Sequence, residues 1–308
     1  MSAYLGMGMT KYTKPALTYA DQLRQLQERG LQVADSARAT MYLERVGYYR
    51  LMGYLFPLRQ TGSDDYLPGA TFETAIERYE FDQVLRLLVM DAICSIEVSV
   101  RTKVTYCMAH RYGAFGHAEP ANLARSGAWH TDWLAGVDDE VGRARETFLD
   151  HYKERYHQPQ YPRVPIWMAS EVMSLGTLSK LIAAMHPVDR KAIAAEFALP
   201  APVFANWLHV VSVVRNVAAH HGRLWNRVFG VAAMRPNNGP FQYMAKAYPP
   251  DRAFFVLQAL RWLLKASMAD ADAWRDRVTD HLQTLLVAPD IERNMGALPN
   301  WNSHPAWR

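Results

Sequence analysis

The sequence lacks the features that mark a metal cluster, a disulfide scaffold or a membrane protein. Its 308 residues include two cysteines, Cys94 and Cys107, and neither belongs to a CxxC pair, which excludes a zinc cluster and a disulfide framework. No apolar run reaches the roughly 18 residues that a membrane-spanning helix needs. The N-terminal stretch MSAYLGMGMTKYTKP has no charged region followed by a long apolar one, as a signal peptide would. We therefore expect a soluble, cytoplasmic protein without a membrane partner.

Common catalytic signatures are also missing. The chain has no GxSxG elbow, no HExxH motif, no P-loop and no cage of acidic residues, so the chemistries that these motifs support are not indicated. We expect neither a metal ion nor a cofactor. Half of the residues are hydrophobic, enough for a sizeable core. Lys and Arg outnumber Asp and Glu by 34 to 30, a mildly basic balance that permits a polyanionic partner.

Helical periodicity is frequent and strand signals are scarce, which predicts an all-α protein. The longest periodic segment covers residues 72–112, where apolar residues recur every three or four positions. We expect a small N-terminal helical extension with a loop over residues 1–70 and a helical domain over 71–308, together one compact unit. The other predicted helices cover residues 21–29, 36–46, 138–157, 166–185, 187–199, 202–222 and 253–268.

The sequence ANWLHVVSVVRNVAAHHGRLWN, residues 205–226, places charged and polar groups at the end of an apolar helix. A structural explanation is a basic helix C-terminus that complements the macrodipole, with Gly222 in the left-handed capping conformation. That explanation accounts for His221 and Arg223. It accounts poorly for Arg215, which lies two turns inside the helix, where a charged group facing an apolar core is costly.

A functional explanation is RNA cleavage without a metal. Histidine transfers protons near neutral pH, arginine stabilises charge on the phosphorus, and the 2′-hydroxyl of the substrate is the nucleophile. The spacing that such a site uses is an arginine followed by a histidine with four to six residues between them, and chance alone gives about three such pairs in a chain of this composition. Arg215 and His220 are distinguished by the apolar helix, by Asn216 directly after the arginine and by the terminating glycine. Four other pairs share the spacing: Arg111/His117, Arg125/His130, Arg145/His151 and Arg275/His281.

The segment RNVAAHHGRLWN closely resembles the core motif of Abi-like abortive-infection proteins of the AbiD/AbiF type, within the HEPN superfamily. Residues 46–59, 72–104 and 295–307 also resemble this family. The resemblance implies a HEPN-type helical bundle and a metal-independent endoribonuclease of a toxin-like phage-defence system. Products with 2′,3′-cyclic phosphate ends are expected. The alternative is a non-catalytic RNA-binding or regulatory module that holds a noncoding RNA or a protein partner.

Position by position, the catalytic arginine of the family falls on Arg215, the polar residue after it on Asn216 and the catalytic histidine on His220. His221 and Arg223 belong to the longer Abi-type motif, and we expect Arg223 to contact RNA. The expected partners are RNA and a second copy of the chain, with an antitoxin if the protein is a restrained toxin.

Helix geometry supports the expectation that two copies of the chain form the site together. Five residues of an ideal helix turn through about 500°, so Arg215 and His220 lie roughly 140° apart, whereas Asn216 and His220 share a face. A two-fold dimer would assemble a complete set of groups around one phosphate. We therefore predict a homodimer in which two Arg215/His220 pairs face one cleft.

Glu97 and Arg101 stand four residues apart among apolar neighbours of the long helix. One interpretation is a solvent-facing ion pair worth about 0.3–0.5 kcal/mol. The other is a supporting role, in which Glu97 orients Arg215 or a catalytic histidine by a charge-assisted hydrogen bond and Arg101 contacts RNA.

Overall fold

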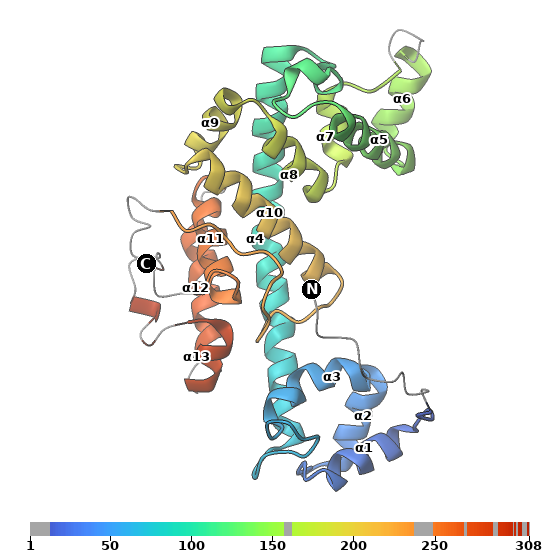
Figure 1. Cartoon of the computed structure of the whole chain (residues 1–308), viewed down its shortest axis with the longest axis vertical. Helices are drawn as coiled ribbons and strands as arrows, with labels where there is room; N and C mark the ends of the chain where they lie inside the picture. Colours follow the sequence, from blue (N-terminus) through green and yellow to red (C-terminus); the bar gives the residue numbers. More distant parts are fainter. Residues whose placement is uncertain are drawn as a thin grey trace, which may run out of the picture. The chain divides into compact units, whose positions relative to one another are not determined.

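The computed structural model describes residues 13–156, 162–236, 249–267, 270–285, 289–297, 299, 301–303 and 307. Within these residues the secondary structure consists of helices and isolated β-bridges, which confirms the predicted all-α class. The α-helices in chain order are α1 (Tyr19–Glu28), α2 (Ser36–Arg45), α3 (Tyr48–Leu55), α4 (Phe72–Tyr112), α5 (Ala128–Arg143), α6 (Thr147–Tyr156), α7 (Ile166–Val172), α8 (Leu175–Ala184), α9 (Pro187–Glu196), α10 (Ala201–Ala219), α11 (Ala253–Lys265), α12 (Ala271–Gln283) and α13 (Pro289–Met295) (Figure 1).

The chain divides into two compact units, Met1–Glu80 and Phe81–Arg308. The first unit packs α1 on α2 and includes the first turns of α4. Glu73 accepts hydrogen bonds from the backbone amides of Ala34 (3.1 Å) and Asp35 (3.3 Å), and Ile76 is buried. These contacts explain why the division falls inside α4, ten residues beyond the boundary at 70/71 expected from the sequence.

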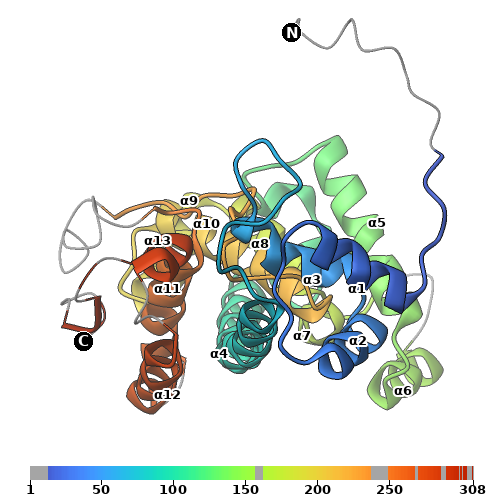
Figure 2. The same ribbon diagram turned by 90° about the horizontal axis from the view of Figure 1, so that it is seen from below.

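In the second unit α10 occupies a central position. It packs against α8, α9 and α11. It also contacts α4, because Val89 of α4, Val214 of α10 and Leu257 of α11 line one small apolar cavity of about 10 Å³. Figure 2 looks along α4 and shows α11 and α12 on one side of it, with α5 and α7 on the other. The apolar side of α10 is thus fixed within the helical core, and its opposite side remains for function.

Two predicted helices are each divided in the structure, so their predicted bounds were wrong. The helix expected over 138–157 is the end of α5 followed by α6, and α5 already begins at Ala128. The helix expected over 166–185 is α7 followed by α8, because Ser174 interrupts it and caps α8 by accepting a hydrogen bond from the Thr177 amide (3.2 Å). A serine inside an apolar pattern can begin a new helix without disturbing the periodicity.

Among the described residues, no single helix is both long and apolar enough to cross a membrane. Helices α9 and α10 meet that condition only when taken together, and they are bent by 73°.

Candidate functional site

The RNVAAHHGRLWN motif, residues 215–226, lies at the C-terminal end of α10 and in the turn that follows it. The helix ends in a Schellman motif. The Gly222 amide donates to the Val217 carbonyl (2.7 Å), and the His221 amide donates to the Ala218 carbonyl (3.0 Å). His221, with a φ of 56°, holds the left-handed position, so the prediction that Gly222 would supply it was wrong. Gly222 is required for another reason: a Cβ there would lie 2.9 Å from both the Val217 carbonyl oxygen and its Cγ1.

This helix end presents the predicted residues with different exposure. His220 is the C-cap, and His220, His221 and Asn216 are exposed, whereas Arg215 and Arg223 are half-buried. Asn216 and His220 therefore share the outward face, as helix geometry predicts, and Arg215 lies on its flank.

Arg215 has an unusual environment for a half-buried cation. Its Nη1 donates to Asn216 Oδ1 at 3.4 Å, and in the part of the chain that the structure describes no carboxylate lies within ion-pair distance of it. A guanidinium that is held at the edge of the protein without a counter-charge is suited to bind an anion from solution.

The turn after the motif is anchored by Asp82, a residue that was not predicted to support the site. Asp82 of α4 is fully buried and accepts hydrogen bonds from the amides of Leu224 (3.1 Å) and Trp225 (2.7 Å). Its second oxygen forms an ion pair with Arg86 at 2.7 Å. The sequence did contain a signal for this contact: Asp82 and Arg86 stand four residues apart inside an apolar stretch. Charged side chains on a buried helix face need hydrogen-bond partners from other elements. Asp82 thus fixes the segment that follows His220 and His221 to the core.

The expected hydrogen bond from Glu97 to Arg215 or a catalytic histidine is not formed. Glu97 instead accepts from Arg101 Nη2 at 2.5 Å, and Arg101 Nη1 donates to the Met173 carbonyl at 3.0 Å. The pair is not solvent-facing either, because the two side chains are only 18% and 10% exposed. Arg101 is therefore a poor RNA contact, and the pair joins α4 to the end of α7.

In three of the four other Arg/His pairs the histidine is less exposed than His220 is. His117 and His130 are buried, and desolvation lowers the pKa of His117 to about 4. His281 is half-buried and burial lowers its pKa too. His151 is exposed, but its own helix carries Asp150 and Glu154 next to it.

Charge distinguishes the motif from the remaining pair. Between Glu196 and Asp251 the chain has no acidic residue, yet it has four arginines and one lysine. The remainder of the chain has 29 basic residues against 30 acidic ones. The basic excess of the protein is therefore concentrated in the segment that contains the motif, which favours a polyanionic ligand there.

The chain after the motif runs back along α10. Asn206 accepts a hydrogen bond from the Met234 amide (2.6 Å) and donates to the Ala232 carbonyl (3.3 Å). The Trp207 indole donates to the Met234 carbonyl at 2.8 Å. We call residues 223–236 the return segment. Because it is tied to both ends of α10, its basic residues stay close to the motif helix.

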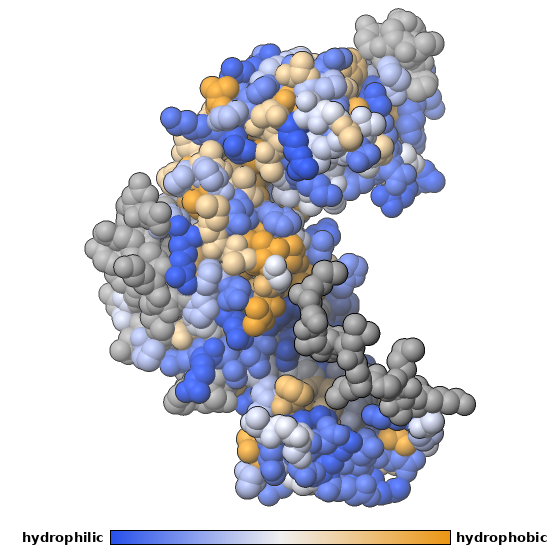
Figure 3. Space-filling view, viewed as in Figure 1, coloured by the Kyte–Doolittle hydropathy of each residue, from blue (hydrophilic) through white to orange (hydrophobic). Residues whose placement is uncertain are grey.

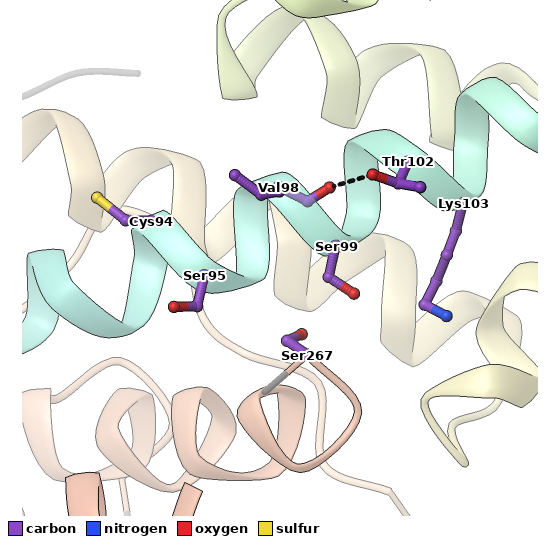
Figure 4. Close-up of a pocket in the computed structure, with 7 residues that line it drawn as sticks. All are labelled: Cys94, Ser95, Val98, Ser99, Thr102, Lys103 and Ser267. Carbon is purple, nitrogen blue, oxygen red and sulfur yellow. Dashed lines mark hydrogen bonds between the residues drawn. The ribbon is translucent and has the colours of Figure 1, made fainter. Parts of the chain in front are cut away.

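The largest volume among the concave regions described is away from the motif. A groove of about 520 Å³ lies between α4 and the end of α11, lined by small hydroxyl side chains, among them Ser95, Ser99 and Ser267 (Figure 4). Among the described residues, no group of three or more His, Cys, Asp or Glu side chains is arranged to hold a metal ion.

The fold and the site together define an all-α protein whose central helix, α10, ends in an exposed basic motif. The chain belongs to the Abi-like protein family, whose model matches residues 41–226 and so includes the motif helix and its closing turn. This membership suggests a role in abortive-infection defence. No curated protein and no solved structure matches the chain significantly.

Proposed function

We propose that this protein is a metal-independent endoribonuclease of the HEPN superfamily, of the AbiD/AbiF type, and that it acts as a toxin in phage defence. The observation that carries the proposal is the end of α10. Among the residues that the structure describes, Arg215 has no carboxylate partner there, and it lies with the exposed His220 in a segment that has no acidic residue. Family membership supports the defence role.

In the proposed reaction His220 takes the proton of the RNA 2′-hydroxyl, and the 2′-oxygen bonds to the adjacent phosphorus while the bond from phosphorus to the 5′-oxygen breaks. The leaving 5′-oxygen takes up a proton. Arg215 stabilises the additional negative charge on the non-bridging oxygens, and Asn216, on the face of His220, hydrogen-bonds the bound strand. The products carry a 2′,3′-cyclic phosphate and a 5′-hydroxyl. Arg223, in the turn after His220 and His221, contacts the backbone of the bound RNA in this proposal.

The direct test is incubation of the purified protein with mixed RNA in EDTA. We expect cleavage that leaves cyclic phosphate ends, and no cleavage of RNA whose 2′-hydroxyls are replaced by hydrogen. Tight RNA binding without cleavage would instead show the non-catalytic module, and absence of both would contradict an RNA-directed function.

We also propose that the active form is a homodimer whose two motifs share one cleft, because Arg215 and His220 diverge by about 140° on one helix. The second copy then supplies a second His220 to protonate the leaving oxygen. Sedimentation should show a dimer at the concentrations at which RNA is cleaved. Mixing Arg215→Ala with His220→Ala subunits should restore part of the activity, since each mixed dimer retains one arginine and one histidine. A monomer with full activity would contradict this proposal.

A further inference from the structure

The exposed face of α10 extends well beyond the motif. His209, Asn216 and His220 are all exposed, and their separations of seven and eleven residues bring each of them within about 20° of one line along the helix. At a rise of 1.5 Å per residue, His209 lies about 10 Å from Asn216 and about 16 Å from His220 along the axis. A second imidazole, that of His209, therefore lies on the exposed face two turns before Asn216.

The surroundings of His209 differ from an ordinary solvated helix face. The return segment passes close to it, held by Asn206, and it exposes Val228 (56%) and Met234 (45%). Figure 3 shows hydrophobic side chains gathered over α10 and the segment that follows it. Apolar side chains beside cations are the combination that binds single-stranded nucleic acid, because bases stack on apolar and aromatic surfaces while the backbone needs positive charge.

The segment that forms this face contributes positive charge and, between Glu196 and Asp251, no acidic residue. The described part of the acid-free segment carries Arg215, Arg223, Arg227 and Arg235, and all four are half-buried, with no acidic residue near them in the sequence. A half-buried arginine can pack its stem on the protein while its charged end reaches solvent, although at Arg235 the Nε atom is itself buried. A strand of phosphates lying along α10 would meet Arg215 at the motif and would have the arginines of the return segment, which is bonded to Asn206 and Trp207 of α10, to bind its backbone.

We propose that His209 is a binding residue for single-stranded RNA, and that the strand lies along the exposed face of α10 from the cleavage point at His220 toward the helix N-terminus. The distance of about 16 Å corresponds to several stacked nucleotides. His209 contacts the strand remote from the scissile phosphate, by stacking or by a hydrogen bond to phosphate. The inference rests on the proposed function in naming RNA as the ligand, but it concerns binding and not the cleavage step.

The test compares His209→Ala with the wild type on two RNAs that each contain a single 2′-hydroxyl, one a dinucleotide and the other about ten nucleotides long. The dissociation constant and KM for the longer RNA should rise about tenfold, with kcat unchanged. Cleavage of the dinucleotide should not change, because it cannot reach His209. His209→Arg should restore tight binding and steepen its salt dependence.

The matched control is His151→Ala, an exposed histidine on α6, which should bind both RNAs as the wild type does. Unchanged affinity of His209→Ala for the longer RNA would overturn the inference, and so would an equal loss on both RNAs. A weaker dimer in sedimentation, with RNA affinity intact, would assign this face to a second copy and overturn it as well. If the wild-type protein bound the longer RNA through His209 but cleaved no RNA, the proposed nuclease activity would be refuted. The proposed RNA-binding surface on α10 would stand.

Discussion

Arg215→Ala and His220→Ala should each abolish RNA cleavage and any growth toxicity while the protein stays folded. Loss of a general acid or base lowers rates by about 10²–10⁴, and loss of the cation removes stabilisation of the phosphorane. The fold should survive because His220 is exposed and the side chain of Arg215, within the described part of the chain, hydrogen-bonds its neighbour Asn216 and not a distant element. Single-turnover cleavage rates and melting temperatures, measured on the same preparations, separate the two effects.

The control is the pair Arg145 and His151, which has the same kind of spacing; Arg145 is exposed just before α6 and His151 is exposed on α6. Alanine at either position should leave cleavage at the wild-type rate. Full activity in His220→Ala would contradict the assignment, and His221, which is exposed beside it, would become the next candidate.

The elements best predicted from the sequence are those whose pattern is long and whose ends are marked. Helix α4 occupies Phe72–Tyr112 as expected, because its apolar residues repeat over many turns and turn-rich sequence flanks it. Helices α7 and α8 were merged because the capping serine between them, Ser174, leaves the apolar pattern intact. Where a helix restarts depends on a side-chain hydrogen bond to the backbone, which periodicity does not reveal.

The places of the candidate site residues on α10 follow from the sequence, but the contacts that support them do not. The position and exposure of His220 follow from helix geometry and a terminating glycine. The left-handed conformation of His221 does not, because histidine adopts it much less readily than glycine does. Of the two interpretations of Glu97, the ion pair with Arg101 is the one that forms, but it is buried and not solvent-facing, because tertiary packing against α7 covers it. Long-range contacts such as Asp82 with Leu224 join residues 142 positions apart, and no local pattern contains them.

Asp82→Ala should cause the largest loss of stability in the vicinity of the motif. It would leave the buried Arg86 without its partner and would orphan the amides of Leu224 and Trp225. Breaking a buried ion pair by removing one partner costs about 3–5 kcal/mol. Urea unfolding should show this loss. Asp82→Asn keeps one acceptor oxygen and should lose less, so cleavage can be measured on a variant that still folds.

Two further variants test whether the effect is specific to Asp82. Asp91→Ala removes another carboxylate of α4 whose partner is Arg277, but both side chains of that pair are about half exposed, so its loss should be at most about 1 kcal/mol. Arg86→Met added to Asp82→Ala removes the uncompensated buried charge and should recover part of the stability. Cleavage should not recover with it, because the amides after the motif still lack their acceptor and the turn beyond His220 remains loose. If the double variant regained both stability and cleavage, Asp82 would serve only to neutralise Arg86, and the turn would be held by other contacts.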